Sequence, residues 1–334
     1  MANLGDQEIG AEYQTIFDPH TCTRRGMCPV TQIRHQGQPF KSHSLYFELH
    51  GKGPEKVVFI MGLNNTSFAW LPQVEHFGKL EQYSVLVFDN RGVGMSDSPR
   101  GPYTTSGMAE DVIALLDYLE WNAERDLHVV GISLGGMIAQ ELAHRIPQRI
   151  TSLSLVVTRA GGRPWNNVPS MKGFLQFARL LTITDPEVKL PIVMDMLFPA
   201  EWLAQKADDD PEGRTNRELQ SEIYRRRFEI TRPQTLIGSL SQMSAAMTHY
   251  VTPDRLRKIS ASIPKVLILS GADDHLINHE QGENLKKHMP EAEYQCWENT
   301  GHGISGQRKA RFNEVLERTF SEGKEAASKM TSNQ

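Results

Sequence analysis

A serine flanked by glycines, in the stretch VVGISLGGMIAQ at residues 129–140, is the strongest chemical signal in the sequence. The apolar segment before it, DLHVV, is typical of a short buried strand, and LGGMIAQELAHRI after it places apolar residues at helical spacing. Gly131, Ser133 and Gly135 fit a G-x-S-x-G turn between strand and helix. The reversal is so tight that side chains on the residues flanking the serine would collide, which is why glycines stand there. The serine itself takes a strained backbone conformation that pushes its hydroxyl out of the sheet. The pattern predicts that Ser133 is a nucleophile.

A nucleophilic serine needs a base that accepts its hydroxyl proton. In an open α/β sheet this base must lie at the carboxyl ends of the strands. Of the 12 histidines, His302 is the one in a glycine-rich loop, NTGHGIS, directly after the last predicted strand. We therefore expect His302 to be the base.

The base in turn needs a carboxylate that orients it. The loop after the preceding predicted strand reads SGADDHLIN and offers Asp273 and Asp274. The order serine, aspartate, histidine along the chain is the one found on this architecture. The residues themselves leave both aspartates open: one would contact the histidine, and the other would hold the turn through backbone hydrogen bonds.

The negative charge that develops on a carbonyl oxygen during acyl transfer needs hydrogen-bond donors. One expected donor is the backbone N–H of Leu134, directly after the nucleophile. The second should come from the loop after the strand KVVFIMG, where Gly62 lets the chain turn and Leu63 follows. Because backbone groups donate, neither position requires a particular side chain.

The surrounding pattern is that of an α/β fold with a mostly parallel, doubly wound sheet and a helical cap inserted after the sixth strand. Strands are predicted at 29–37, 44–51, 56–62, 83–90, 128–133 and 152–158, and again at 265–271 and 292–298. Helices are predicted at 68–80, 103–121, 134–146, 171–181, 190–198, 216–230, 236–247, 279–289 and 308–320. The stretch from 162 to 258 holds helical patterns and no convincing strand.

These patterns predict a domain organisation. It comprises an N-terminal extension at 1–28, a core at 29–161 and 259–321, a cap at 162–258 and a flexible tail at 322–334. The methionines of the cap region have two readings, helix packing and the lining of an apolar pocket. They are Met171, Met194, Met196, Met243 and Met247.

Composition excludes several classes of protein. The net charge of −4 gives no reason to expect a nucleic-acid partner, and the basic run at 225–227 is expected to be a solvated helix face. Cys22, Cys28 and Cys296 are too few for a disulfide framework, and their spacing is not that of a zinc site. Neither a metal nor an organic cofactor is expected.

The sequence also bears on location. Residues 1–13 contain Asp6, Glu8 and Glu12 and lack the apolar core of a signal peptide. No apolar run approaches the roughly eighteen residues that a membrane span requires. We expect a cytoplasmic protein, and the sequence does not indicate its oligomeric state.

Five motifs, taken together, resemble those of the α/β-hydrolase fold superfamily. In order along roughly residues 40–320 they are FIMGLNNTSFAW, VFDNRGVGMSDSP, GISLGG, LILSGADDHLIN and NTGHGIS. They resemble the capped branch, which includes esterases, epoxide hydrolases, prolyl iminopeptidases and carbon–carbon bond hydrolases. The MGL and FDNRGVGMS forms are most similar to those of fungal and plant members.

The resemblance implies a helical lid and selects Asp274 as the acid. It implies that the loop containing Asp89, Arg91, Gly92 and Gly94 has a structural role, with Arg91 bonded to loop carbonyls. Many relatives have His-Gly where this chain has Met61 and Gly62, which alters the polarity beside the acyl pocket. Haloalkane dehalogenases and capped epoxide hydrolases use an aspartate at the nucleophile position, so a serine there disfavours both activities.

Three functions are compatible with this site. The leading one is a serine hydrolase, of the carboxylic ester hydrolase class, acting on an ester, thioester or related small acyl compound. The second uses the same three residues for carbon–carbon cleavage, aminopeptidase action or acyl transfer. The third is a hydrolase scaffold that binds a ligand without catalysis. Arg159, just after a predicted strand, either holds the lid junction or selects an anionic substrate.

Overall fold

The computed structural model describes residues 14–31, 42–162, 167, 179–180, 183, 185–208 and 210–332. Within these residues one sheet holds eight strands in the order β1-β2-β4-β3-β5-β6-β7-β8. Their bounds are β1 Cys22–Val30, β2 His43–His50, β3 Glu55–Ile60, β4 Tyr83–Phe88, β5 Leu127–Ile132, β6 Ile150–Val156, β7 Lys265–Gly271 and β8 Glu293–Trp297. The β1–β2 and β2–β4 pairs are antiparallel and the others are parallel.

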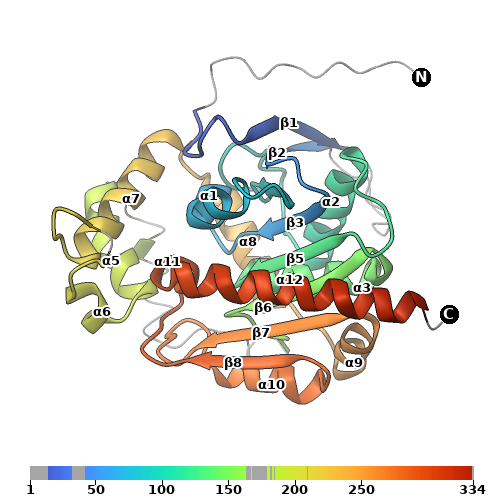
Figure 1. Ribbon diagram of the computed structural model, residues 1–334. Helices are drawn as coiled ribbons and strands as arrows, with labels where there is room; N and C mark the ends of the chain where they lie inside the picture. The colour runs from blue at the N-terminus through green and yellow to red at the C-terminus, as the bar shows by residue number, and fades with distance from the viewer. Residues whose placement is uncertain are drawn as a thin grey trace.

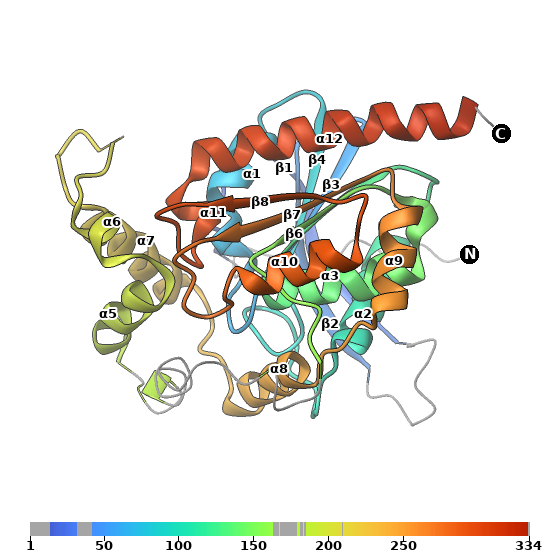
Figure 2. The ribbon, with the colours of Figure 1, turned by 90° about the horizontal axis from the view of Figure 1, so that it is seen from below.

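Helices cover both faces of the sheet (Figures 1 and 2). One face carries α1 Leu71–Phe77, which follows a short 3₁₀ turn at Ser67–Trp70, together with α11 Ile304–Gln307 and α12 Lys309–Ser332. The other face carries α2 Thr105–Tyr118, α3 Leu134–Arg145, α9 Pro253–Ser262 and α10 Glu280–His288, and a 3₁₀ turn at Pro147–Arg149 precedes β6. This arrangement confirms the predicted fold class. No helix in the described part of the chain is long and apolar enough to cross a membrane.

Burial explains why the central strands read as continuous apolar runs. Every residue of β5 and β6 is buried, because helices pack on both sides of them. Two apolar clusters result, one on each face of the sheet. One includes Leu115 of α2 and Ile138 of α3, and the other includes Phe77 of α1 and Phe320 of α12.

Between β6 and β7 the described residues form loops, isolated β-bridges that join Gly161 to Tyr250 and Lys206 to Thr215, and several helices. The helices are α5 Pro186–Leu197, α6 Ala200–Ala204, α7 Asn216–Ile230, α8 Leu236–Thr248 and α9. The first three stand to one side of the sheet (Figure 2) and share a small apolar cluster that includes Met194 and Tyr224. The cap boundaries at 162 and 258 stay a prediction, since α9 begins inside them and packs against α3 and α10. Most of the helix predicted at 171–181 lies outside the described residues.

The first strand was predicted in the wrong place. Instead of 29–37, β1 spans Cys22–Val30 and pairs with β2 from Cys22 opposite His50 to Val30 opposite His43. The sheet therefore begins inside the predicted N-terminal extension, and 32–41 lie outside the described residues. Cys28 and Val30 are fully buried, whereas Pro29 between them is exposed. A proline is accommodated because β1 is an edge strand, which leaves one row of N–H groups without a partner strand.

The predicted flexible tail from residue 322 is wrong as far as Ser332, because α12 continues to that residue. Lys324 forms an ion pair with Glu55 of β3, and Ala327 is buried. A Cβ atom at Gly323 would lie 2.9 Å from Ser152 Cβ, so the small residue lets the helix approach β6 closely. Small and polar residues that suggested disorder instead permit this packing.

A buried polar cluster fixes α12 to the sheet. His128 of β5 is buried, with Nδ1 2.8 Å from Ser152 Oγ and Nε2 3.4 Å from Glu55 Oε2. Burial lowers the pKa of the His128 imidazole. Burial alone would raise the pKa of Glu55, but contacts from His128, Lys324 and Gln82 outweigh it and lower the pKa to about 2.

Replacing Glu55 with glutamine should therefore weaken the acid-side pH dependence of stability. A carboxylate with a folded-state pKa below the ordinary 4.5 stabilises the fold above that value, and the contribution is lost as pH falls toward about 2. His128 adds to the same trend, because the unfolded chain takes up its proton as pH falls through 6.5. We expect Glu55→Gln to lower the free energy of unfolding by about 1–2 kcal/mol at neutral pH.

Chemical denaturation measured from neutral pH downward checks this. The curve for Glu55→Gln should flatten below about pH 5, while the exposed control Glu325→Gln should follow the wild type. Parallel curves for the wild type and Glu55→Gln would contradict the account.

Candidate active site

Ser133 lies at the turn where β5 ends and α3 begins. Its φ of +56° and ψ of −120° are unusual for a residue with a side chain. The turn is held on both sides: Ser133 N–H donates to Val156 O at 2.9 Å, and Thr158 Oγ1 donates to Ser133 O at 2.8 Å. Such a conformation persists only where the surrounding structure fixes it.

The two glycines of the motif are required by close backbone approach. A Cβ atom at Gly131 would lie 2.4 Å from Gly135 O, and one at Gly135 would lie 2.0 Å from Ile60 O. The spacing predicted from the sequence therefore has a steric cause in this fold. Gly136, which the motif does not require, is also constrained, since its Cβ would lie 2.6 Å from Thr158 Cβ.

His302 and Asp274 form a buried pair. His302 Nδ1 lies 2.7 Å from Asp274 Oδ2, while Asp274 Oδ1 accepts the N–H groups of Leu276 at 2.8 Å and Ile277 at 3.0 Å. Asp273 is only half-buried, and its N–H donates to Thr300 O at 3.0 Å. The structure thus brings Asp274 rather than Asp273 to His302. A hydrogen bond at Nδ1 fixes the orientation of the imidazole ring and leaves Nε2 free to accept or donate a proton.

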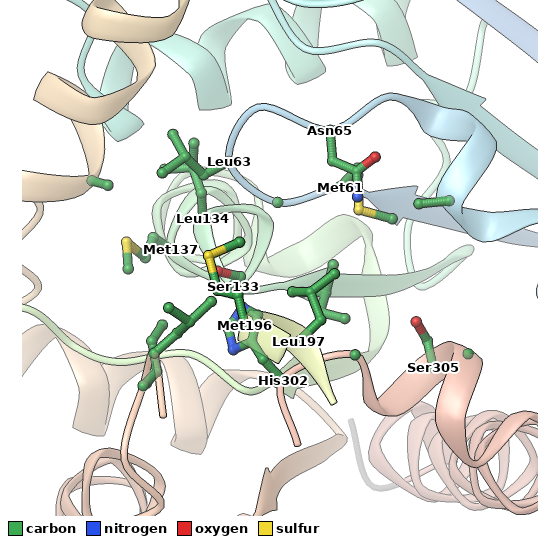
Figure 3. A pocket seen from close by; sticks show the side chains of 18 of the residues that line it. Met61, Leu63, Asn65, Ser133, Leu134, Met137, Met196, Leu197, His302 and Ser305 are labelled. Atoms are coloured by element: carbon green, nitrogen blue, oxygen red, sulfur yellow. The ribbon is translucent and has the colours of Figure 1, made fainter. Parts of the chain in front are cut away.

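A cavity of about 300 Å³ joins these residues, since Ser133 and His302 both line it. Figure 3 shows the two side chains at its centre, with Met196, Leu197 and Leu134 around them. His302 comes from the loop after β8, and Ser133 from the turn after β5. Parallel strands end at the same edge of the sheet, which is why residues so distant in sequence meet here.

The end of helix α5 packs against the loop that carries His302. Gly303 N–H donates to Leu197 O at 2.8 Å, and a Cβ atom at Gly303 would lie 2.4 Å from the ring of Phe198. A Cβ atom at Gly301 would lie 2.6 Å from Leu197 O. The glycines around His302 therefore allow the end of α5 to pack directly on the loop.

The two predicted oxyanion donors also lie at this cavity, because Leu63 and Leu134 both line it. Leu134 is the first residue of α3, where backbone N–H groups lack intrahelical acceptors and the helix dipole favours negative charge. A Cβ atom at Gly62 would lie 3.1 Å from Ser133 Cβ, so the loop after β3 passes alongside the serine. The role of these amides as donors stays a prediction.

Gln242 of α8 connects the loop after β3 to the loop after β4. Its Oε1 accepts Asn64 N–H at 2.8 Å, and its Nε2 donates to Arg91 O at 2.8 Å. Asn64, at a φ of +55°, also donates from Nδ2 to Ser239 Oγ at 2.8 Å. Sequence reasoning missed Gln242. The available signal was its spacing of three residues from Ser239, which places both on one face of the helix.

The loop after β4 is held internally. Asp89 accepts the N–H groups of Ser67 at 2.8 Å and Met95 at 2.9 Å, and burial raises its pKa to about 6. Arg91 forms an ion pair with Asp111 and donates from Nη2 to Gly107 O at 3.1 Å. These bonds favour the structural role that the resemblance implies, although the main partner of Arg91 is a carboxylate rather than loop carbonyls.

The cavity wall is mostly apolar. The inserted methionines divide between the two predicted roles: Met196, Met243 and Met247 line the cavity, while Met194 is buried in the apolar cluster of the inserted helices. Met171 lies outside the described residues. Met61, which stands where many relatives have histidine, contributes to the wall as well.

Two arginines interrupt this wall. The prediction that 225–227 is a solvated face is wrong for Arg227, which is buried and lines the cavity, whereas Arg226 is exposed. Arg159 lines the cavity and donates from Nη2 to Asn167 O at 2.7 Å. Arg159 therefore holds the junction with the inserted segment and also reaches the cavity.

A second cluster of chemistry-bearing side chains lies near the edge of the sheet. Cys22, Glu48 and His50 place one potential ligand atom each within 4.8 Å of one another. Glu48 Oε1 already accepts the Thr15 hydroxyl at 2.9 Å, and His50 Nδ1 lies 2.8 Å from Thr21 Oγ1. These bonds tie the first described residues to β2, and we give the cluster that structural role.

A methyl group added at Gly135 should disrupt this site. Its Cβ would meet the backbone oxygens of Ile60 and Met61, at 2.0 and 2.8 Å, and backbone cannot rotate away as a side chain can. We expect Gly135→Ala to lower the free energy of unfolding by about 3 kcal/mol. Gly306 also lines the cavity, but its Cβ would have 3.9 Å of room, so Gly306→Ala should change stability by less than about 0.5 kcal/mol.

Urea denaturation of both variants measures the difference. Equal stability of Gly135→Ala and Gly306→Ala would contradict the close approach of α3 to the end of β3.

Comparison with known protein families gives a match over most of the chain. The family model for the alpha/beta hydrolase fold matches residues 56–308. A protein named putative carbamate hydrolase RutD, from Caulobacter vibrioides, is 28% identical over 276 residues, which are 81% of this chain and 93% of that protein.

Solved structures with the same fold include enzymes with different substrates. A thermophilic esterase from Thermogutta terrifontis superposes with a TM-score of 0.68 at 19% identity, covering 90% of this chain and 99% of its own. The enol-lactonase from Burkholderia xenovorans LB400 superposes with a TM-score of 0.65 at 23% identity, covering 84% of this chain and 97% of its own. At these identities the likeness concerns the fold alone.

Proposed function

This chain belongs to the alpha/beta hydrolase fold family, and we propose that it is a serine hydrolase that cleaves an ester, thioester or related acyl compound. One observation carries the proposal. Ser133, in a strained strand-to-helix turn, shares a cavity with His302. The Nδ1 atom of this histidine is bonded to the buried carboxylate of Asp274. Nucleophile, base and orienting acid are the three parts that acyl transfer by serine requires.

In the proposed first half-reaction, His302 Nε2 accepts the proton of Ser133 Oγ as the oxygen attacks the substrate carbonyl. Asp274 holds the imidazole through Nδ1 and stabilises the imidazolium that forms. Its own position is set by the N–H groups of Leu276 and Ile277, so the carboxylate does not need to move. The imidazolium then donates its proton to the departing alcohol or thiol.

The tetrahedral oxyanion would be bound by the N–H groups of Leu63 and Leu134. Loss of one such donor typically costs about 2.7–4 kcal/mol of transition-state stabilisation. Water, deprotonated by His302, then attacks the acyl-enzyme and restores Ser133. Two hydrogen bonds support the binding of the oxyanion by Leu63, because they fix the loop on either side of that residue. Gln242 Oε1 accepts the N–H of Asn64, and Asn90 Nδ2 donates to the carbonyl of Met61.

The chemistry of the site restricts the class of bond that can be cleaved more than the names of the relatives do. The name of the RutD relative refers to carbamates, whose carbonyl carbon is attacked in the same way as that of an ester. The same residues could also serve carbon–carbon cleavage, aminopeptidase action or acyl transfer, and a scaffold that binds without turnover is the non-catalytic alternative. A panel of short esters, carbamates, diketones and aminoacyl amides separates these functions.

The neighbouring aspartates provide a matched test. We expect Asp274→Asn to lower kcat for an activated ester by about 10³–10⁴-fold, because an amide cannot stabilise the imidazolium or hold the correct tautomer. Asp273→Asn should stay within about threefold of the wild type, since Asp273 does not contact His302. Steady-state hydrolysis of p-nitrophenyl butyrate measures both.

Two results would contradict the proposal. Full esterase activity in His302→Ala would remove His302 as the base. Tight ligand binding by a folded wild-type protein that turns over no member of the panel would favour the binding scaffold.

A further inference from the structure

Arg227 of α7 is a buried cation in the wall of the proposed catalytic cavity. The residue is 8% exposed, and within the described residues its Nε and Nη1 have no hydrogen-bond partner. The guanidinium carbon lies 3.7 Å from the centre of the Tyr224 ring, a contact that supports a positive charge without using its N–H groups. A buried charge with unused donors is costly unless something binds it.

Other arginines on or beside α7 do have carboxylate partners. Arg225 is paired with Glu187, Arg217 with Asp195, and Arg214 with Asp210. The Arg225 and Arg217 pairs are exposed to solvent, and Arg214 is partly exposed. In water such ion pairs contribute little to stability. Arg227 differs from these arginines, because it faces the cavity and has no such ion pair among the described residues.

The described cavity wall holds no carboxylate that could pair with Arg227. None of the described residues that line the cavity is an aspartate or glutamate. The sequence from 163 to 184, much of which lies outside the described residues, contains no acidic residue either. Among the described residues of the cavity wall, nothing neutralises this charge, so a bound anion would find it available.

Arg159 brings a second cation to the same cavity. One of its N–H groups is used, from Nη2 to Asn167 O at 2.7 Å, but its Nε is buried without a partner in the described part of the chain. Asn167 is itself fixed, because its Nδ2 donates to Met247 O at 2.8 Å and His249 O at 3.0 Å. Two cations and no carboxylate among the described lining residues favour a positive potential in this cavity.

We propose that the substrate carries a carboxylate, remote from the carbonyl that is cleaved, and that Arg227 binds it with Arg159 as the second cation. The inference rests on the proposed hydrolase function for the position of the reacting carbonyl. The planar fork of an arginine matches a carboxylate and forms two parallel hydrogen bonds with it. Methionine and leucine side chains make up much of the rest of the cavity wall, which suits a short hydrocarbon chain.

Two pairs of esters test the proposal, each pair differing only at the remote end. Mono-p-nitrophenyl suberate is compared with p-nitrophenyl suberamate, and ω-acetoxyhexanoate with ω-acetoxyhexanamide. The first pair has its carboxylate on the acyl side and the second on the alcohol side. We expect kcat/KM of the wild type to favour the carboxylate at least about tenfold in one pair, as a charge-assisted hydrogen bond allows.

The arginine variants assign this preference to one side chain. Arg227→Gln should abolish it, Arg227→Lys should retain part of it, and the exposed control Arg226→Gln should retain all of it. Because Arg227 has no carboxylate partner to lose among the described residues, Arg227→Gln should not lower the thermal midpoint. No preference in the wild type for either pair, or an unchanged preference in Arg227→Gln, would overturn the proposal.

A binding measurement separates this proposal from the hydrolase function. Calorimetric titration of Ser133→Ala with dicarboxylates from succinate to suberate should show binding that the matching diamides lack. The same binding should disappear in Ser133→Ala/Arg227→Gln and persist in Ser133→Ala/Arg226→Gln. That pattern without hydrolysis of any ester would reject the proposed function and keep the carboxylate site, whereas no binding of any dicarboxylate would reject the site.

Discussion

The turn at Ser133 can exist only because three backbone segments approach one another without intervening side chains. Gly131 lies against Gly135, and Gly135 lies against the last residue of β3, Ile60. Hydrogen bonds from the strand β6 side then hold Ser133 at a positive φ. The same contacts bring the N-terminus of α3 and the loop after β3 to the serine. One set of backbone contacts therefore positions the proposed nucleophile and both proposed oxyanion amides, and it also holds the strained conformation of Ser133.

The inserted helices complete the site rather than merely cover it. Helix α8 reaches the loops after β3 and β4 through Gln242, and the end of α5 packs against the glycines beside His302. Helix α7 contributes Arg227, a buried cation whose Nε and Nη1 have no hydrogen-bond partner among the described residues. In our proposals the core supplies the reacting groups and Arg159, while the inserted segment shapes the cavity and supplies Arg227.

The sequence allowed the residues of the proposed catalytic site to be located because each follows a strand, and parallel strands end at one edge of the sheet. Ser133, Asp274 and His302 could be found by that rule, although the choice of Asp274 over Asp273 needed the resemblance. Arg227 could not be found, since its helix is polar on most sides and only tertiary packing shows which face is buried. The extent of α12 was misjudged for a related reason: small residues that suggest disorder also allow close packing.

Reaction with a fluorophosphonate is the most direct test of the central claim, that Ser133 is an activated nucleophile beside a formed oxyanion site. The reagent forms a stable adduct only with a serine that is both deprotonated by a base and able to place an oxyanion. Intact mass and peptide mapping should show a single adduct on Ser133, absent from Ser133→Ala and much slower to form in His302→Ala. No adduct on the folded wild-type protein, or an adduct on a different residue, would contradict the account.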